Sequence, residues 1–339
     1  MPESPIQIWA LLGARAGDND QVLALAKALG LPFEVKPLDY NGLHRLGPRL
    51  LGRSLASLTR AARTTIVNEP PPDLTISTGH RSVPVVRALR HRSRGTMRSI
   101  HIGFPRVSPG HFDLVIATPQ YPIADHPNLL RLPYALTGAA VAAASQADQP
   151  PIATVPAPRR LLVVGGPTLF WKLDVRSLRE TLSGMIEEAR AEGGSVLVTT
   201  SPRTPAAVRG EIASMLANSP VPTLLAEPGE LPSYESLLGL AHSIRVTADS
   251  VSMISDAIWT GKPMALIPIA KSSLGRVAFR LADLLAPGRQ LYPQDLRFFW
   301  RALADLGVTE RPSKARTSAQ DQMNKVLERT RPIVRGSRR

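Results

Sequence analysis

The sequence predicts an α/β protein made of two doubly wound, Rossmann-like parallel sheets that face each other across a cleft. Three observations predict this fold class. Short apolar runs rich in Ile, Leu and Val are each closed by turn residues, and helical patterns lie between them. A stretch rich in Ala and Pro follows at 139–160, and after it the same pattern begins again. A chain of 339 residues is long enough for two such domains.

The first half of the chain carries the first series of strands. The apolar runs that predict them lie at 6–13, 73–79, 99–104 and 113–119. Between the first and second runs, "DQVLALAKALG" predicts a helix for which Asp18 or Asn19 supplies the N-cap and Gly30 the end. We therefore expect a Rossmann-like N-terminal domain over residues 1–145, followed by a linker at 146–159.

The second half repeats the arrangement with five strand candidates. They lie at 160–166, 195–201, 221–227, 243–249 and 263–269, again separated by helical segments. Residues 160–310 are thus predicted to form a second Rossmann-like domain, and 311–339 a basic C-terminal helix and tail. Sheets of this type bind ligands beyond the carboxyl ends of their strands, so we expect the ligand there.

Composition excludes several classes of function. The chain has no cysteine, which excludes disulfides, thiolate metal sites and cysteine nucleophiles, and its seven histidines show no metal-ligand spacing. The net charge is +14, but aromatic residues are 5% of the chain, too few for the stacking used by readers of single-stranded nucleic acid. We expect neither a metal nor nucleic acid as a partner. No run of eighteen apolar residues occurs, so we expect a cytoplasmic protein.

One basic segment, residues 43–63, predicts an amphipathic helix. Five arginines (Arg45, Arg49, Arg53, Arg60 and Arg63) fall within about 80° on a helical wheel, and leucines occupy the opposite side. Such a helix either packs its leucines on the core with its arginines in water, or contacts an anionic membrane surface. The second alternative predicts a peripheral position on the inner membrane.

The segment "TADSVSMISDAIWTGKP", 247–263, predicts a binding site for phosphate. A strand ends at Asp249, and Ser250 and Ser252 open a helix whose free amides and dipole attract an anion. Asp249 either belongs to this site or caps the helix, in which case its charge opposes a phosphate. Asp256, further along the helix, is placed to accept hydrogen bonds from ribose hydroxyls.

The run of Asp249-Ser250, Asp256-Ala257 and Gly261-Lys262-Pro263 resembles the donor-site segment of the GT-B superfamily, especially UDP-N-acetylglucosamine 2-epimerases and related glycosyltransferases. Val251 and Ser252 replace the two glycines of that segment. Several further stretches together resemble a mitochondrial-fission family named for elongated mitochondria, over roughly residues 6–310: "GARAGDNDQVLALAKALG", "STGHRSVP", "HIGFPR", "VVGGPTLFWKLD" and "TTSPRTP". The resemblance implies a GT-B-like fold. It also implies, for plant members, the recruitment of a dynamin-related protein at the mitochondrial surface.

The resemblance also bears on the reaction. The epimerases carry two carboxylates at positions that His80 and Gly103 occupy here, so epimerase chemistry is disfavoured. A transferase needs a clamp for the leaving diphosphate and a base for the acceptor. The predicted clamp consists of Gly165, Gly166, Thr168, Ser201, Arg203, Ser250 and Ser252. Among these, Arg203 is the best single charge, because a guanidinium binds phosphate bidentately.

The N-terminal domain supplies the candidates for the base. His80 follows the strand at 73–79 at the start of a helix, and its ordinary pKa near neutrality makes it the first candidate. Asp18 is the second, with the N-cap as its alternative role. His101 lies within a strand and is expected to be a core residue.

Two functions of different classes follow. The first is a glycosyltransferase-type enzyme that takes a nucleotide sugar, expected to be UDP-linked, as its substrate without a separate cofactor, and acts at the membrane surface on envelope material. The second is a GT-B-shaped adaptor without turnover that recruits a protein partner to a membrane. The replaced glycines and missing carboxylates favour the adaptor; Ser250, Asp256 and Arg203 favour the enzyme.

Overall fold

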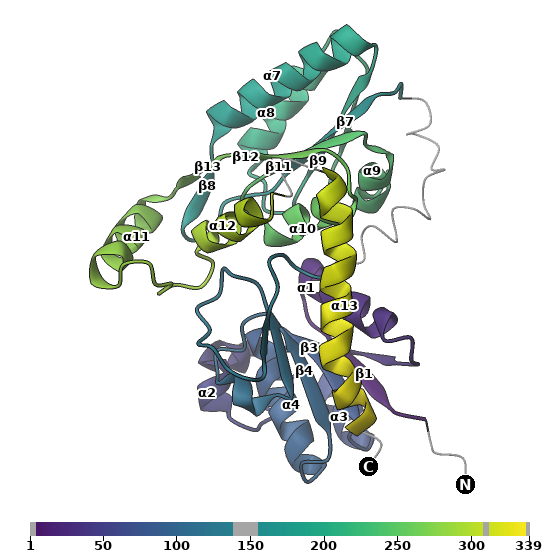
Figure 1. The fold of residues 1–339 in the computed structure, drawn as a ribbon, viewed down its shortest axis with the longest axis vertical. Coiled ribbons are helices and arrows are strands. Elements are labelled where there is room, and N and C mark those ends of the chain that lie inside the picture. Colours follow the sequence, from purple (N-terminus) through teal and green to yellow (C-terminus); the bar gives the residue numbers. More distant parts are fainter. Residues whose placement is uncertain (1–4, 138–154, 308–311, 337–339) are drawn as a thin grey trace. The chain divides into compact units, whose positions relative to one another are not determined.

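The computed structural model describes residues 5–137, 155–307 and 312–336. The chain divides into two compact units. The first consists of Met1–Leu136 with Gln320–Arg339, and the second of Thr137–Ala319. Each unit has a parallel sheet of its own (Figure 1). Most of the linker predicted at 146–159 lies outside the described residues.

The first unit contains a six-stranded sheet in the order β2-β1-β3-β4-β5-β6, and every neighbouring pair is parallel. Its strands are β1 (Ile8–Leu12), β2 (Glu34–Pro37), β3 (Leu74–Thr78), β4 (Arg98–Ile102), β5 (Leu114–Ala117) and β6 (Leu129–Arg131). Its helices before residue 137 are α1 (Ala16–Ala28), η1 (Gly42–Leu46), α2 (Gly47–Leu51), α3 (Arg60–Asn68), α4 (Gly79–Arg92) and η2 (Pro109–His111). The four predicted strands are present, and β2 and β6 are additional.

The core of the first unit lies between this sheet and the helices α3 and α4. Trp9 and Leu11 of β1 pack with Ile66 of α3 and with Val86 and Leu89 of α4. All five side chains are buried almost completely. Burial of side chains of this size stabilises a fold by roughly 1.5–3 kcal/mol each. This packing fixes where α4 begins, and therefore where His80 lies.

The second unit contains a five-stranded parallel sheet in the order β10-β9-β7-β11-β12. Its strands are β7 (Arg159–Val164), β9 (Ser195–Thr200), β10 (Thr223–Ala226), β11 (Ser243–Thr247) and β12 (Met264–Ile267). An antiparallel pair, β8 (Trp171–Leu173) and β13 (Ile269–Lys271), is attached to it. Its helices before residue 307 are α7 (Val175–Glu192), α8 (Ala206–Ala217), α9 (Tyr234–Leu240), α10 (Val251–Trp259), α11 (Ser273–Leu285) and α12 (Leu296–Leu306).

Helices cover both faces of the second sheet (Figure 1). Leu182 of α7 and Ile212 of α8 pack on Leu162 and Val198 on one face. Side chains alternate along a strand, so the intervening buried residues of β7 point to the other face, where α9 and α10 lie. The predicted second doubly wound sheet is thereby confirmed. In such a sheet the loops after β7, β9 and β11 meet at one edge, where the candidate site lies.

The last helix, α13 (Pro312–Gly336), carries the chain back to the first unit. Gln322 donates a hydrogen bond from Nε2 to the carbonyl oxygen of Tyr134 at 3.0 Å. Arg329 donates from Nη2 to the carbonyl oxygen of Pro127 at 2.7 Å. Part of the basic C-terminal segment predicted at 311–339 is therefore a packed helix of the first unit.

The predicted amphipathic helix over 43–63 is wrong. The segment forms the short helices η1 and α2, an irregular stretch, and then α3. Gly47 and Gly52 have φ angles of 75° and 57°, which interrupt a right-handed helix at both ends of α2. The arginines therefore do not form one stripe, and the leucines do not form one buried face: Leu50 is 79% exposed, whereas Leu58 is buried.

Two further predictions concern membranes and metals. Within the described residues, none of the helices has both the length and the apolar character needed to cross a bilayer. The same residues contain no group of three or more histidines and carboxylates placed to hold a metal ion.

Candidate functional site

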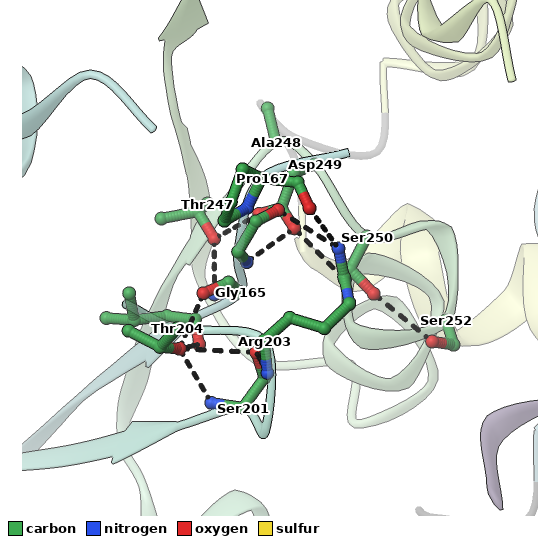
Figure 2. Close-up of polar contacts among 12 residues, drawn as sticks. Gly165, Pro167, Ser201, Arg203, Thr204, Thr247, Ala248, Asp249, Ser250 and Ser252 are labelled. Carbon is green, nitrogen blue, oxygen red and sulfur yellow. Dashed lines mark hydrogen bonds and ion pairs between the residues drawn. The ribbon is translucent and has the colours of Figure 1, made fainter. Parts of the chain in front are cut away.

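The candidate phosphate site is built from three loops at the carboxyl ends of β7, β9 and β11 (Figure 2). They carry Gly165 and Gly166, Ser201 and Arg203, and Asp249 and Ser250 respectively. Because the three strands are neighbours in the order β9-β7-β11, loops that are far apart in sequence meet here. The fold thus brings together the residues that the sequence predicted to hold a diphosphate.

Asp249 is the centre of this arrangement (Figure 2). Its Oδ2 accepts hydrogen bonds from the amide of Gly166 at 2.9 Å and from Nη2 of Arg203 at 3.2 Å. Its Oδ1 accepts from Oγ1 of Thr247 at 2.6 Å. The Asp249 side chain is only 1% exposed. A buried carboxylate needs such partners, and here they join all three loops.

At Gly165 and Gly166 the lack of a side chain matters more than the backbone amide. A Cβ on Gly165 would lie 2.2 Å from Oδ2 of Asp249, and a Cβ on Gly166 would lie 2.3 Å from the carbonyl oxygen of Arg203. The amide of Gly165 donates to Oγ1 of Thr247 at 2.8 Å, and that of Gly166 to Asp249. Both amides predicted for the diphosphate therefore already have acceptors within the protein.

Arg203 is held in a defined position with much of its surface open. Nη1 donates to the carbonyl oxygens of Gly166 at 3.0 Å and Pro167 at 3.4 Å, and Nη2 contacts Asp249. The Arg203 side chain is 44% exposed. A guanidinium has more N–H donors than these contacts use, and it prefers the geometry of phosphate oxygens. Arg203 is thus oriented in advance for an anion.

Hydroxyl groups shape the loop that carries Arg203. Oγ of Ser201 accepts from the amide of Arg203 at 3.2 Å, so Ser201 forms the turn and is itself buried. Oγ1 of Thr204 accepts from the amide of Ser201 at 3.0 Å and lies 2.6 Å from the carbonyl oxygen of Gly165. The sequence prediction missed Thr204 and Thr247, although a hydroxyl within two residues of a predicted ligand is a recognisable sign of a side-chain turn.

The N-terminus of α10 has the character expected of an anion site. Ser250 is the N-cap residue, and its side chain makes no capping hydrogen bond. Instead, Oγ of Ser250 lies 3.2 Å from Oγ of Ser252. Asp249 directs its carboxylate to the other loops, so the alternative that it caps the helix is not realised. Backbone amides and two hydroxyls remain at the positive end of the helix dipole.

Asp256 and Thr168 lie in the same unit with different surroundings. The carboxylate of Asp256 accepts from the hydroxyl of Tyr234 at 3.1 Å and from that of Thr137. Protein hydroxyls thus occupy positions that were predicted for a ribose. Thr168 follows the glycine turn, and its Oγ1 is buried without a hydrogen-bond partner among the described residues.

The first unit places Asp18 and His80 at one corner of its sheet, at the carboxyl ends of β1 and β3. His80 lies in the first turn of α4, as predicted. Asp18 lies in the first turn of α1, whose N-cap is Arg15, so the predicted N-cap role of Asp18 or Asn19 is wrong. Asn19 instead accepts from the amide of Gly13 at 2.8 Å. A Cβ on Gly79 would lie 3.9 Å from Oδ2 of Asp18.

The pKa of His80 differs from the value near neutrality that we expected from the sequence. Burial and the nearby positive charges of Arg106, Arg81 and Arg15 lower the pKa of His80 to about 4. Burial raises the pKa of Asp18 above its ordinary value, and Arg15 partly opposes this shift. His80 is therefore a neutral imidazole at neutral pH, able to accept a proton but weakly basic. The sequence prediction did not include Arg106 and Arg15, which arrive from distant loops.

His101 is a core residue of β4, as expected. It is fully buried, its Nδ1 lies 3.1 Å from Oγ of Ser77, and its Nε2 has no partner among the described residues. Its ring packs against Phe112. Burial, and to a lesser extent His80, lowers the pKa of His101 to about 3.

This low pKa predicts a loss of stability in acid. Between its folded pKa and the ordinary value near 6.5, His101 stays neutral in the folded state and is protonated in the unfolded state. Its contribution is therefore complete above about pH 6.5 and falls by about 1.4 kcal/mol per pH unit as the pH decreases. Denaturant unfolding of the His101→Gln variant at a series of pH values is expected to show a shallower dependence than the wild type. Equal slopes would contradict the assignment.

Comparison with known proteins places this geometry in a family. The family model described as Mitochondrial fission ELM1 matches residues 16–292. The chain is 25% identical over 244 residues to the mitochondrial fission protein ELM1 of Arabidopsis thaliana, which covers 64% of this chain and 56% of that protein. It is 24% identical over 301 residues to the uncharacterized protein RP120 of Rickettsia prowazekii, covering 76% and 82% respectively. The chain therefore spans little more than half the length of the plant protein.

Solved structures show the fold. The UDP-GlcNAc 2-epimerase of Methanocaldococcus jannaschii has a TM-score of 0.52 and 12% identity, with 95% of this chain and 99% of that chain covered. The UDP-GlcNAc 2-epimerase of Neisseria meningitidis bound to UDP-GlcNAc has a TM-score of 0.50 and 10% identity, covering 95% and 100%. At such low identity these likenesses show the fold alone, and they confirm the predicted GT-B-like class of two Rossmann-like domains.

Proposed function

The chain belongs to the Mitochondrial fission ELM1 family and has a GT-B-like fold, and from that premise we propose that its second unit binds a nucleoside-diphosphate sugar, with UDP as the expected nucleotide. One observation carries the proposal. The N-terminus of α10, where Ser250 makes no capping hydrogen bond, and the Arg203 side chain, which is 44% exposed, lie beside the same residue, Asp249. Backbone amides, hydroxyls and a preoriented guanidinium are the donors that a diphosphate needs.

The reaction we propose is transfer of the sugar to a hydroxyl-bearing acceptor. The acceptor oxygen forms a bond to the anomeric carbon, the bond from that carbon to the diphosphate breaks, and UDP leaves with the electron pair. Arg203 and the helix dipole stabilise the charge on the leaving diphosphate. The acceptor proton passes to a general base, for which His80 and Asp18 are the two candidates that the sequence predicts.

Thermal melting with UDP, UDP-N-acetylglucosamine and nucleotides of other bases tests the binding proposal. A ligand that binds only the folded state stabilises it by about 2.7 kcal/mol at a concentration of 100 times its Kd. We expect UDP to raise the melting temperature of the wild type and of His80→Gln, because His80 is a candidate base for the acceptor and not one of the predicted phosphate ligands. Arg203→Ala and Asp256→Ala are expected to weaken the effect of UDP.

A non-enzymatic adaptor is the second candidate, and the amides of the glycine turn favour it. The amide of Gly165 donates to Thr247 and that of Gly166 to Asp249, so neither of these predicted phosphate donors is free for a ligand. If no nucleotide raises the melting temperature of the wild type, the adaptor replaces the enzyme as the better account.

A membrane-surface position is supported by α11 more strongly than by the segment 43–63. The inner face of α11 is buried through Ala278, Phe279 and Ala282. Five large apolar side chains of the same helix are exposed, with Val277, Leu284 and Leu285 at 65%, 76% and 68% and Leu274 and Leu281 at 50% and 45%. On an ideal helix these five fall within about 100° of one another. Exposed apolar patches of this kind mark interaction surfaces.

Charge around α11 fits an anionic bilayer surface. On the helical wheel Arg280 and Arg276 lie beside one edge of the apolar stripe, and Lys271 and Arg289 lie just before and after the helix. Asp283 is the acid of this helix, and its carboxylate accepts from Nη1 of Arg297 at 2.9 and 3.0 Å. An apolar stripe bordered by cations is the pattern of helices that lie in a membrane interface.

Sedimentation with phosphatidylglycerol vesicles tests this contact. The Val277→Gln/Leu284→Gln variant is expected to bind at least about tenfold more weakly than the wild type, since each buried leucine or valine contributes roughly 1.5–3 kcal/mol. The matched pair Leu46→Gln/Leu50→Gln changes exposed leucines of the segment 43–63 and is expected to have the smaller effect. Binding that is indifferent to lipid charge or to the α11 substitutions would contradict the assignment, as would self-association through α11 without vesicles.

A further inference from the structure

The first unit contains a cavity lined by cations that none of the functions above uses. Its volume is about 450 Å3, within the range of ligand pockets. We call it the arginine cavity, and its charged lining residues are Arg53, Arg87, Arg90, His91, Arg94 and His111. They come from α4 and the turn that follows it, from η2, and from the loop between α2 and α3.

The arginine cavity lies at the opposite edge of the sheet from His80 and Asp18. Helix α4 begins at the carboxyl end of β3 and ends at Arg92, just before the amino end of β4. His111 directly precedes β5. The cavity is therefore separate from the candidate base of the first unit, and it contains no residue of the second unit.

Positive charge in the arginine cavity is only partly balanced. Asp113 accepts from Nη1 of Arg90 at 3.3 Å and from Nη1 of Arg98 at 3.0 Å, so two guanidiniums already share this carboxylate. Among the described residues, the side chains of Arg53 and Arg87 make no hydrogen bond and no ion pair. Because Arg53 and Arg87 line the same cavity, their like charges raise the free energy of the unliganded protein.

The positive charges that line the cavity also lower the pKa values of Arg87 and His111. The pKa of Arg87 is lowered by burial and by the charge of Arg53. The pKa of His111 is lowered by burial and by Arg87, Arg53 and Arg90, and all of these neighbouring charges are positive. The cavity opens to solvent, but its lining contains six basic side chains and no acidic one, so the arrangement is not a set of structural ion pairs.

We propose that the arginine cavity is a binding site for a compact phosphate anion that carries two or more negative charges, independent of the nucleotide-sugar site. Arg53 and Arg87 bind the phosphate oxygens directly, and Arg90 and Arg94 supply further charge. Guanidiniums bind phosphate in a bidentate manner, and several of them together favour a multiply charged anion over a single carboxylate. Such an anion is either a soluble polyphosphate compound or the headgroup of a phosphate-monoester lipid.

Calorimetric titration of the full chain with inorganic triphosphate tests the site. We expect saturable binding by the wild type and binding at least about tenfold weaker by Arg53→Gln/Arg87→Gln, which loses two charge-assisted contacts. The matched control Arg60→Gln/Arg63→Gln changes the same net charge at two exposed positions of α3 that do not line the cavity, and it is expected to bind as the wild type does. Saturating UDP, which fills the proposed nucleotide site, is expected to leave the binding of triphosphate to the arginine cavity unchanged.

The stability of the variants provides the second measurement. Removal of mutually repelling guanidiniums is expected to leave the melting temperature of unliganded Arg53→Gln/Arg87→Gln equal to or above that of the wild type. Competition by phosphatidylcholine vesicles with phosphatidate, but not by phosphatidylcholine alone, would identify a lipid headgroup as the source; absence of competition would identify a soluble anion. Unsaturable binding, or equal losses in the cavity pair and the α3 pair, would overturn the proposal.

Discussion

Replacing Gly165 with alanine is expected to destabilise the second unit by about 3 kcal/mol, the upper range for an overpacked site. The added Cβ would lie 2.2 and 2.3 Å from the two carboxylate oxygens of Asp249, distances that no carbon tolerates. The carboxylate must then move, which breaks its contacts to Gly166, Thr247 and Arg203. Denaturant unfolding followed by far-UV circular dichroism measures the change.

Gly184→Ala is the matched control for this substitution. Gly184 lies inside α7, and a Cβ there would meet nothing within 4 Å. Alanine in a helix interior is about 1 kcal/mol more favourable than glycine, so this variant is expected to be more stable than the wild type. The double variant Gly165→Ala/Asp249→Ala is expected to be less destabilised than the sum of its single variants, because the clash needs both side chains. Additive losses of stability in the double variant, or equal changes in stability for Gly165→Ala and Gly184→Ala, would contradict the packing described.

Arg203→Gln is expected to weaken the binding of UDP by about tenfold to a hundredfold, as measured by calorimetric titration. A charge-assisted hydrogen bond to phosphate contributes roughly 1.5–3 kcal/mol, and the shorter, uncharged glutamine loses it. The effect on stability without ligand is expected to be small, because Arg203 is 44% exposed and an exposed ion pair contributes little.

Arg190→Gln controls for the change in net charge. Arg190 lies on the exposed face of α7 in the same unit, away from the loops that carry Asp249 and Arg203. It is expected to bind UDP as the wild type does. If both variants lose affinity equally, the effect comes from the general positive field of the unit and not from a contact of Arg203.

Local sequence patterns were sufficient to predict the architecture of two parallel sheets. Short apolar runs closed by turn residues identified the central strands of both sheets, because a parallel strand buried on both faces must be apolar along its whole length. The edge strand β2 was missed because three of its four residues are exposed, so it has no apolar run. The helix over 43–63 was wrong because a helical wheel assumes continuous helix, whereas Gly47 and Gly52 interrupt it with positive φ angles.

The sequence predicted that the three loops meet, but not how their residues are connected. Arg203, Asp249 and the glycine turn do meet, as expected of loops after neighbouring parallel strands. That Asp249 would occupy the amide of Gly166, 83 residues away, required the three-dimensional structure. The same holds for His80, whose pKa is lowered by burial and by Arg106 and Arg15 from two other parts of the first unit, as well as by its sequence neighbour Arg81.

The central claim is that the second unit receives a diphosphate at the N-terminus of α10 beside Arg203. A crystal structure of the protein grown with saturating UDP tests it most directly. We expect diphosphate oxygens within hydrogen-bonding distance of the Ser250 and Ser252 hydroxyls and of the Arg203 guanidinium, with the Asp249 carboxylate still bound to Gly166. UDP bound elsewhere, or a site that stays closed around Asp249 at a UDP concentration that saturates binding in solution, would contradict the account.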